Sequence, residues 1–409
     1  MKLKSAPGGW YLHPFEIGVT GGSREKRSAL AEMLAGKLSG EGRSCGFIAL
    51  DNESEEGTLS PAEARTFSDR TRIDVANGPR GPETSLMQQS MATVDTLVVA
   101  GAELPPIPAL VMFEGSARES IRTGKAPIAV IHEGNDATRA RDFARRVGAA
   151  HVLAVTDREA ILEAVRGFFD GRIPAVHGLV LAGGKSTRMG RDKAAIEFTP
   201  GTSQARRAAE LLSQVCDSVY LSARAEQPLP EDTKHVPVIP DLYDGFGPLA
   251  GILSAFAHDP RAAWFVVGCD MPLLESGDVR ELFRRRNPYR LATCFATPAD
   301  SPQGHTPAQG DRSEDGSSSA GSHPRAPDAS PELLPEPLCA VYEPKARTRM
   351  FTFLAEGVTC PRWMLRNGGA DYILPSRPQA VYNANDAGDL ARAKAYARAA
   401  GNVGEKEAW

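Results

Sequence analysis

The sequence lacks paired cysteines and long apolar runs, and each absence excludes a class of protein. Its six cysteines are scattered through 409 residues, and no two form a Cys-x-x-Cys pair. This spacing argues against a structural zinc site or a disulfide framework and is typical of reduced, mostly buried thiols. No apolar run approaches the roughly 20 residues of a membrane helix, and the N-terminal stretch lacks the apolar core of a signal peptide. We therefore expect a cytoplasmic protein that does not enter a membrane.

The chain also lacks a strong charge imbalance. Its formal net charge is −4 and its pI is about 6.1, so no bulk attraction to nucleic acid or to an anionic membrane is expected. The hydrophobic content of 42% is normal for a soluble globular protein. A length of 409 residues exceeds what one core usually spans, so two domains are expected.

Short apolar runs alternate with helical patterns along the whole chain. Runs this short and this apolar are typical of parallel strands that are buried on both faces. The segments 24–38 and 157–169 place their apolar residues on one helical stripe. The alternation predicts two doubly wound, mostly parallel α/β domains. The expected strands are 15–19, 45–50, 95–100, 108–113, 126–131, 151–155, 178–182, 218–222, 264–268 and 290–295.

Two breaks divide this pattern. The segment 168–178 carries Gly171 and Pro174 between a helix and a new strand, so we place the domains at 1–170 and 171–409. A second segment, about 297–330, contains no Val, Ile, Leu, Met, Phe, Trp or Tyr. Such a segment cannot bury enough surface to offset its ordering entropy, and we predict a disordered insertion in the second domain.

The most informative stretch is "GLVLAGGKSTRMGRDK", residues 178–193. A buried strand ends at Gly183 and Gly184, where the missing Cβ atoms let backbone N–H groups approach a ligand. Lys185, Arg188 and Lys193 then supply positive charge for a polyphosphate. Ligands of open α/β sheets bind at the carboxyl ends of the strands, where this loop falls. The stretch is neither a Walker loop nor a GxGxxG fingerprint, which disfavours kinases and dehydrogenases.

Three further motifs follow in order. "FVVGCDMPLL" ends a buried strand at Asp270, whose carboxylate suits Mg²⁺ beside substrate phosphates or caps the next helix. "VIPDLYDGFGPLAGILSAF" places Asp241 after a strand-like run and before a helix, and a structural turn would explain it equally. "VYNANDAGDL" places Asn383 and Asn385 before a helix, where Asn385 or Asp386 could simply cap it.

Together with "EPLCAVY", these motifs resemble those of the molybdenum cofactor guanylyltransferases of the MobA type, from about 177 to 395. The resemblance implies a Rossmann-like nucleotidyltransferase fold. It also implies transfer of GMP from GTP to the phosphate of molybdopterin, with Mg²⁺ as cofactor and pyrophosphate as product. Molybdoenzymes or their chaperones are the implied recipients.

The same resemblance implies roles for residues at matching positions. Backbone groups of Leu181, Ala182 and Gly183 would line the guanine pocket, and Asp241 would contact the nucleoside. Gly184, Arg188 and Lys193 would hold the triphosphate, so that Lys193, Arg188 and Asp270 form the catalytic set. Asp270 would bind Mg²⁺, and Asn383 and Asn385 would lie beside the pterin. Relatives often carry Asn where this chain has Arg224, which we place in the nucleotide-binding set.

Two alternatives remain open at this point. One is a molybdopterin cytidylyltransferase or another nucleotidyltransferase, although the cytidylyltransferase relatives usually write Ala-Gly at Gly183-Gly184. The other is a non-catalytic protein that binds and delivers the cofactor. Production of the pterin dinucleotide from GTP or from CTP would separate these readings.

The N-terminal domain opens with "GVTGGSREKRSAL", which has the outline of a phosphate loop. When Gly21 is aligned with the first glycine of GxxxxGK[ST], Lys26 stands at the second glycine and Arg27 at the lysine. A side chain at the second glycine obstructs the phosphate cradle, and Arg does not replace a compact ammonium. The position of this domain, before a MobA-like segment, suggests a fusion, and the domain weakly resembles a molybdopterin-guanine dinucleotide adapter of the MobB type. We predict a degenerate P-loop-like domain that hydrolyses NTP weakly or not at all and serves as a docking scaffold.

Overall fold

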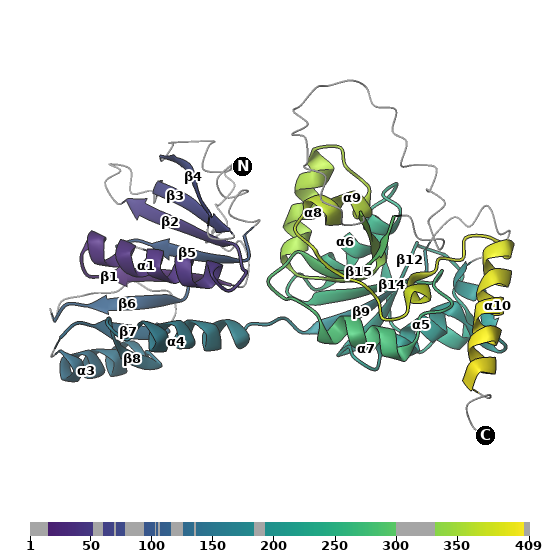
Figure 1. Ribbon diagram of the computed structural model, residues 1–409, viewed down its shortest axis with the longest axis horizontal. Coiled ribbons are helices and arrows are strands. Elements are labelled where there is room, and N and C mark those ends of the chain that lie inside the picture. Colours follow the sequence, from purple (N-terminus) through teal and green to yellow (C-terminus); the bar gives the residue numbers. More distant parts are fainter. Residues whose placement is uncertain are drawn as a thin grey trace. The chain divides into compact units, whose positions relative to one another are not determined.

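The computed structural model divides the chain into two compact units, Met1–Ile173 and Pro174–Trp409. It describes residues 15–51, 60–68, 71–77, 94–102, 104, 107–115, 126–134, 136–183, 193–299 and 332–404. Each unit is an α/β domain built around one main sheet (Figure 1). The class expected from the alternating pattern, α/β with mostly parallel sheets, is confirmed.

The first unit contains an eight-stranded sheet among its described residues, in the order β4-β3-β2-β5-β1-β6-β7-β8. Neighbouring strands in the run β2-β5-β1-β6-β7-β8 are parallel. Strands β3 and β4 add an antiparallel hairpin beside β2 at one edge. Their bounds are β1 Glu16–Gly21, β2 Cys45–Asp51, β3 Ser60–Ser68, β4 Thr71–Asn77, β5 Thr96–Ala100, β6 Ala109–Phe113, β7 Ala129–His132 and β8 His151–Ala154.

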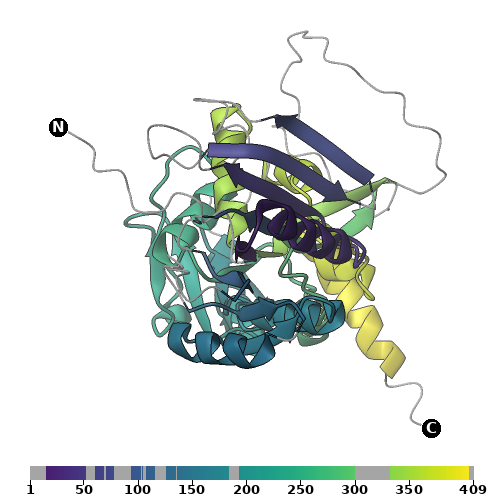
Figure 2. The same cartoon turned by 90° about the vertical axis from the view of Figure 1, so that its left-hand side faces the viewer.

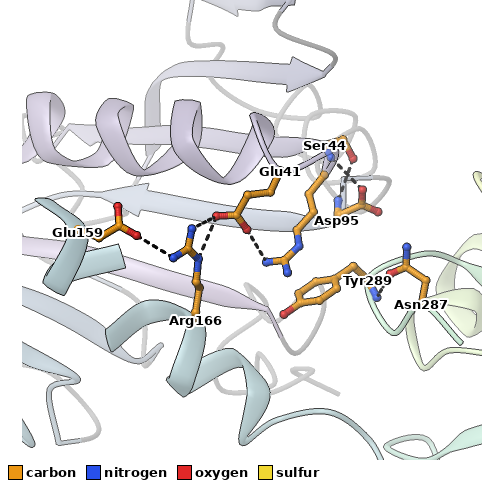
Figure 3. Close-up of polar contacts among 8 residues, drawn as sticks. Glu41, Ser44, Asp95, Glu159, Arg166, Asn287 and Tyr289 are labelled. Atoms are coloured by element: carbon orange, nitrogen blue, oxygen red, sulfur yellow. Dashed lines mark hydrogen bonds and ion pairs between the residues drawn. The ribbon is translucent and has the colours of Figure 1, made fainter. Parts of the chain in front are cut away.

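Among the described residues, three helices pack on this sheet: α1 (Arg24–Ser39), α3 (Ala137–Val147) and α4 (Arg158–Asp170). Helix α1 packs against β1, β2 and β5 (Figure 2). It buries Leu30, Leu34 and Leu38. Arg166 of α4 donates to Glu41, which follows α1, and to Glu159 near the start of the same helix (Figure 3). The pair with Glu41 connects α4 to the end of α1. Exposed ion pairs of this kind add little stability.

The second unit contains a seven-stranded sheet in its described part, in the order β13-β12-β9-β14-β16-β15-β17. Strand β16 is antiparallel to both of its neighbours, β14 and β15, and the other pairs are parallel. A separate β10-β11 pair lies outside this sheet. The bounds are β9 Val176–Leu181, β10 Glu197–Thr199, β11 Thr202–Ser203, β12 Ser218–Ala223, β13 Val238–Pro240, β14 Ala263–Gly268, β15 Ala292–Pro298, β16 Leu333–Tyr342 and β17 Asp371–Ile373.

Helices cover both faces of the second sheet. Successive strand residues alternate between the faces, so that Val180 packs in the core formed with α5 and α7, and Leu179 packs in the core formed with α6, α8 and α9. The helices of this unit are α5 Gln204–Leu212, α6 Pro248–His258, α7 Ser276–Arg284, α8 Lys345–Ala355, α9 Pro361–Asn367 and α10 Ala387–Gly404, with short 3₁₀ turns η1 Lys193–Ala195, η2 Glu231–Thr233 and η3 Pro378–Val381.

A buried ion pair joins the end of β16 to the start of the unit. The guanidinium of Arg286 donates to both carboxylate oxygens of Glu343 at 2.6 and 2.8 Å and to the carbonyl of Pro174 at 3.0 Å. Glu343 is 1% exposed, and burial raises the pKa of its carboxyl despite the paired guanidinium. Removal of one partner would strand the other, so this pair is costly to break.

Two expectations meet the structure only in part. Most of the predicted insertion lies at 300–331, outside the described residues, while Thr297 and Pro298 belong to β15. The domain assignments, including the P-loop-like character of the first unit, stay predictions. None of the six cysteines forms a disulfide. Where side chains and backbone are described, no helix has the length and apolar content needed to cross a bilayer.

Candidate active site

The carboxyl ends of four parallel strands meet at one edge of the second sheet. The register pairs Leu181 at the end of β9 with Ser222 on β12 and with Gly268 on β14, and Ser222 in turn pairs with Ile239 on β13. Each strand therefore stops at the same level, and the loops that follow surround a common space. Open parallel sheets bind their ligands at such an edge.

A cavity of about 670 Å³ occupies this edge, a size within the ~300–1,000 Å³ range of small-molecule sites. Six residues that the sequence assigned to nucleotide or metal binding line it together: Leu181, Ala182, Gly183, Arg224, Asp241 and Asp270. The other lining residues are Ser222, Tyr243, Asp244, Gly245, Gly247, Pro248, Ala250, Gly251, Gly268, Cys269 and Leu338. Residues more than 80 positions apart in the sequence thus share one site.

Asp241 follows β13 and is held in place by two residues at the end of the neighbouring strand β12. Its backbone N–H donates to the carbonyl of Ala223 at 2.9 Å, and its Oδ1 accepts a 2.6 Å hydrogen bond from the Ser222 hydroxyl. A Cβ on Gly183 would lie 3.3 Å from Asp241 Oδ2, so the glycine leaves the carboxylate room at the pocket wall. Because the hydroxyl of Ser222 holds Oδ1, the carboxylate of Asp241 has a fixed orientation at the wall of the cavity.

The end of β9 is supported by a residue that the sequence analysis missed. Gln227 Nε2 donates to the carbonyl of Ala182 at 2.8 Å, and its Oε1 accepts from the backbone N–H of Arg224 at 3.4 Å. One amide therefore connects the strand end to the turn that carries Arg224. No motif marks Gln227, since its role depends on how β9 and β12 lie side by side.

Asp270 follows β14, and Gly268 explains why the motif reads "VGCD". A Cβ on Gly268 would meet Asp270 Oδ1 at 2.6 Å and Leu338 Cβ at 3.3 Å, so a larger residue would displace the carboxylate. The carbonyl of Asp270 accepts a 2.7 Å hydrogen bond from the N–H of Ala384. The segment with Asn383 and Asn385 is therefore joined directly to the Asp270 turn, and Asp270 and Ala384 line a narrow crevice together.

The two asparagines differ in their surroundings. Asn383 is partly buried, and its Nδ2 donates to Glu336 at 2.9 Å. Asn385 is exposed, and its backbone N–H donates to Asp389 at 2.8 Å. Asp389 also donates its N–H to Asp386 at 2.8 Å, which is the reciprocal arrangement of a helix cap at the start of α10. The helix-capping reading therefore suits Asp386, whereas the NH₂ group of Asn383 is bound to the buried Glu336.

The residues predicted to bind the triphosphate lie largely outside the described part of the chain. Gly184 and Arg188 fall in the segment 184–192, outside the described residues. Lys193 opens the turn η1, but its side chain is likewise not described. Across the described residues no cluster of three or more His, Cys, Asp or Glu side chains could hold a metal ion by itself. A cation at this edge would need oxygens from a ligand besides Asp270 and Asp241.

The loop after β1 in the first unit is bound by two carboxylates that follow β6 and β7. Lys26 Nζ lies 3.0 Å from Glu114 Oε1 and 2.8 Å from Glu133 Oε2. Glu114 Oε1 also accepts from the N–H of Ser23, the cap of α1, at 3.2 Å. Arg27 folds back to donate to the carbonyl of Gly22. Hydrogen bonds and attraction between these groups raise the pKa of Lys26 and lower that of Glu114.

Comparison with known proteins adds a family to this geometry. Residues 178–359 match the MobA-like NTP transferase domain. A "Molybdenum cofactor biosynthesis bifunctional protein" of Synechocystis is 30% identical over 230 residues, which cover 56% of this chain and 56% of that protein. A "Probable molybdenum cofactor guanylyltransferase" of Mycobacterium tuberculosis is 42% identical over 113 residues, 26% of this chain and 55% of the relative. The chain thus spans little more than half the length of these relatives.

A solved structure gives a further comparison. The molybdopterin-guanine dinucleotide biosynthesis protein A from Archaeoglobus fulgidus is 19% identical and has a TM-score of 0.37, covering 54% of this chain and 98% of that chain. The family match falls on the unit whose strand ends form the pocket. The C-terminal half of the chain therefore carries a MobA-like NTP transferase domain.

Proposed function

We propose that the second unit transfers GMP from GTP to the phosphate of molybdopterin and releases pyrophosphate. The observation that carries this proposal is the pocket at the strand ends, which gathers six separately predicted residues in a MobA-like domain. The names of the relatives, a molybdenum cofactor guanylyltransferase and a bifunctional protein of molybdenum cofactor biosynthesis, supply the substrates.

The reaction needs no protein nucleophile. A phosphate oxygen of molybdopterin attacks the α-phosphorus of GTP, a new P–O bond forms, and the bond between the α-phosphorus and its bridging oxygen breaks. Both electrons of that bond leave with pyrophosphate. Since the acceptor is already an anion, the protein contributes mainly by positioning the two substrates in line and by neutralising charge.

We assign the nucleotide to the 670 Å³ pocket. Backbone groups of Leu181, Ala182 and Gly183 would contact the base, Asp241 the nucleoside, and Arg224 the rim of the pocket. Gly184, Arg188 and Lys193 would hold the triphosphate, as the resemblance implies. Asn383 and Asn385 would lie on the pterin side, next to the reacting phosphates through the link between Ala384 and Asp270.

The donor set of the pocket fits a Mg²⁺ ion. Asp270 and Asp241 both line the cavity with oxygen ligands, and Mg²⁺ takes one or two carboxylates together with substrate phosphates and waters. We assign the metal to Asp270. When bound, Mg²⁺ would polarise the phosphates and offset their charge.

We further propose that the first unit serves as a docking scaffold and not as an NTPase. The carboxylate of Glu114 accepts a hydrogen bond from the N–H of Ser23, the backbone position at which a helix N-terminus would bind an anion. The lack of disulfides among the six cysteines is consistent with a cytoplasmic location. Molybdoenzymes or their chaperones would receive the product.

A nucleotide competition assay tests the main proposal. The full chain is incubated with molybdopterin, Mg²⁺ and equal concentrations of GTP and CTP, each labelled at the α-phosphate, and the pterin dinucleotides are separated. We expect the guanine dinucleotide to predominate. A predominance of the cytosine product would assign the chain to the cytidylyltransferase activity instead. Tight pterin binding without any dinucleotide would indicate a delivery protein.

A further inference from the structure

A buried carboxylate on β16, Glu336, lies between the nucleotide pocket and the asparagine segment. Glu336 is 3% exposed although it follows the described start of the strand by only three residues. Burial of an ionisable group is costly unless its partners are well placed. The partners of Glu336 therefore indicate what the residue does.

The two carboxylate oxygens of Glu336 serve two different parts of the site. Oε1 accepts from the backbone N–H of Leu338 at 3.0 Å, and Leu338 lines the nucleotide pocket. Oε2 accepts from Nδ2 of Asn383 at 2.9 Å, with the guanidinium of Arg362 at 3.8 Å. One side chain thus joins the pocket wall to the segment assigned to the pterin side.

The bond to Glu336 determines which way the amide of Asn383 points. An ionised carboxylate only accepts hydrogen bonds, so the NH₂ group of Asn383 must face Glu336 and its Oδ1 must face away. Oδ1 is buried and accepts no hydrogen bond from the part of the chain that the structure describes. A buried acceptor of this kind is set to receive an N–H or O–H donor from a ligand.

The position of Asn383 relates this acceptor to the reacting centre. The next residue, Ala384, donates its N–H to the carbonyl of Asp270 at 2.7 Å. A substrate that contacts Asn383 Oδ1 would therefore lie beside the strand end that we assign to the metal and the phosphates. A pterin ring carries amino and ring N–H donors, which match a fixed carbonyl acceptor.

We propose that Glu336 is a positioning residue that orients Asn383 so that its Oδ1 accepts a hydrogen bond from the pterin of the acceptor substrate. This inference rests on the proposed function and extends it to a residue outside the predicted site. Glu336 itself would touch neither substrate. Its effect would therefore appear in the use of molybdopterin and not in the use of GTP.

The first test compares Glu336→Gln with Glu343→Gln. Both substitutions remove a buried carboxylate while conserving shape, but Glu343 directly follows β16 and pairs with Arg286, away from the Glu336 end of the strand. A glutamine amide at position 336 can present either its oxygen or its NH₂ group to Asn383, so the amide orientation is no longer fixed. We expect the KM for molybdopterin to rise roughly tenfold in Glu336→Gln, the cost of one hydrogen bond to a charged partner, with the KM for GTP within twofold of wild type.

A double substitution provides a rescue experiment. In Asn383→Asp two carboxylates face each other, and we expect pterin affinity to fall at least as far as in Glu336→Gln. In Glu336→Gln/Asn383→Asp the donor and the acceptor exchange places, and position 383 keeps an oxygen directed at the substrate. We expect the double variant to regain most of the affinity that either single variant loses, an outcome that a purely structural role does not predict.

Isothermal titration of molybdopterin in the absence of GTP separates this proposal from the proposed reaction. If wild type binds molybdopterin and the variants follow the expected order, Glu336 positions Asn383 whether or not GMP is transferred. If Glu336→Gln binds molybdopterin like wild type, or if its affinities for GTP and molybdopterin fall together as in Glu343→Gln, the positioning role is wrong. Failure of wild type to bind molybdopterin would overturn both proposals.

Discussion

The substitution Gly251→Ala gives a sharp test of the pocket wall. Gly251 lies in the middle of α6, where alanine would ordinarily stabilise a helix by ~1 kcal/mol. A Cβ at this position would lie 2.6 Å from Leu181 Cδ2 and still closer to the hydroxyl of Ser222. The helix therefore approaches the ends of β9 and β12 too closely to accommodate a methyl group.

The expected magnitude follows from opposing effects. Overpacking of a well-filled core costs ~1–3 kcal/mol, and both Leu181 and Ser222 are buried, at 9% and 1% exposed. With a cost near the upper part of that range, the propensity gain leaves a net loss of about 1–2 kcal/mol in the free energy of unfolding. Movement of Ser222 would also weaken its 2.6 Å hydrogen bond to Asp241. We expect the KM for GTP to rise about three- to tenfold.

Gly277→Ala is the matched control. Gly277 lies in α7 of the same unit, and a Cβ there meets no heavy atom within 4 Å. We expect this variant to be as stable as wild type or more stable by up to ~1 kcal/mol, with an unchanged KM for GTP. Urea unfolding followed by tryptophan fluorescence reports on this unit because Trp264 is fully buried in its core. If Gly251→Ala behaved like Gly277→Ala in both assays, the close approach of α6 to the pocket would be refuted.

Three further outcomes are expected. Asp270→Asn should abolish metal-dependent GMP transfer while leaving the urea midpoint near that of wild type, and retained transfer would remove the metal assignment. The wild-type chain should not bind a fluorescent ATP analogue through its first unit, whereas Lys26→Gly/Arg27→Lys, which restores the phosphate-loop letters, should bind it more tightly; binding by wild type alone would contradict the closed loop. Burial raises the pKa of Cys45 to about 12, so at pH 8 its thiolate fraction is very small and iodoacetamide should modify the partly exposed Cys360 first, as peptide mapping would show.

Most strands of the sheets were predictable because buried parallel strands have a strong apolar signature. Each of the ten expected runs corresponds to a strand in the structure. Strand β16 was not among them. Its sequence contains Pro335 and Pro337, and proline within a run argues against a central strand. The prolines lie where the pairing with β15 shifts register, so local irregularity accommodates what the sequence pattern disfavours. The β3-β4 hairpin was also missed, since its segments are polar and show no apolar run.

The site was predictable where a chemical group had to stand at a strand end. Gly183, Asp241 and Asp270 carry that signal, since a short apolar run followed by a glycine or a carboxylate marks the ligand edge of a parallel sheet. Gln227 and Glu336 carry no such signal. Gln227 acts through the spacing of two neighbouring strands, and Glu336 acts through a segment almost 50 residues away. Supporting residues of this kind are defined by tertiary contacts, which one sequence does not reveal.

The two phosphate-loop-shaped segments of the chain illustrate the same distinction. In the first unit, the carboxylate of Glu114, which follows β6, accepts a hydrogen bond from Ser23 and pairs with Lys26. A phosphate would have to displace a carboxylate that is tethered to the protein and held within hydrogen-bond distance. In the second unit, Asp241 is held by a hydroxyl and by backbone, with its carboxylate at the wall of an open cavity. In the first unit, the charge of Lys26 is neutralised by carboxylates of the protein itself. In the second unit, the carboxylate of Asp241 is oriented by its hydrogen bond and lines the cavity. Glycine and lysine residues in a motif do not by themselves distinguish a closed loop from an open pocket. The difference lies in distant residues, Glu114 and Ser222, that the charged groups contact.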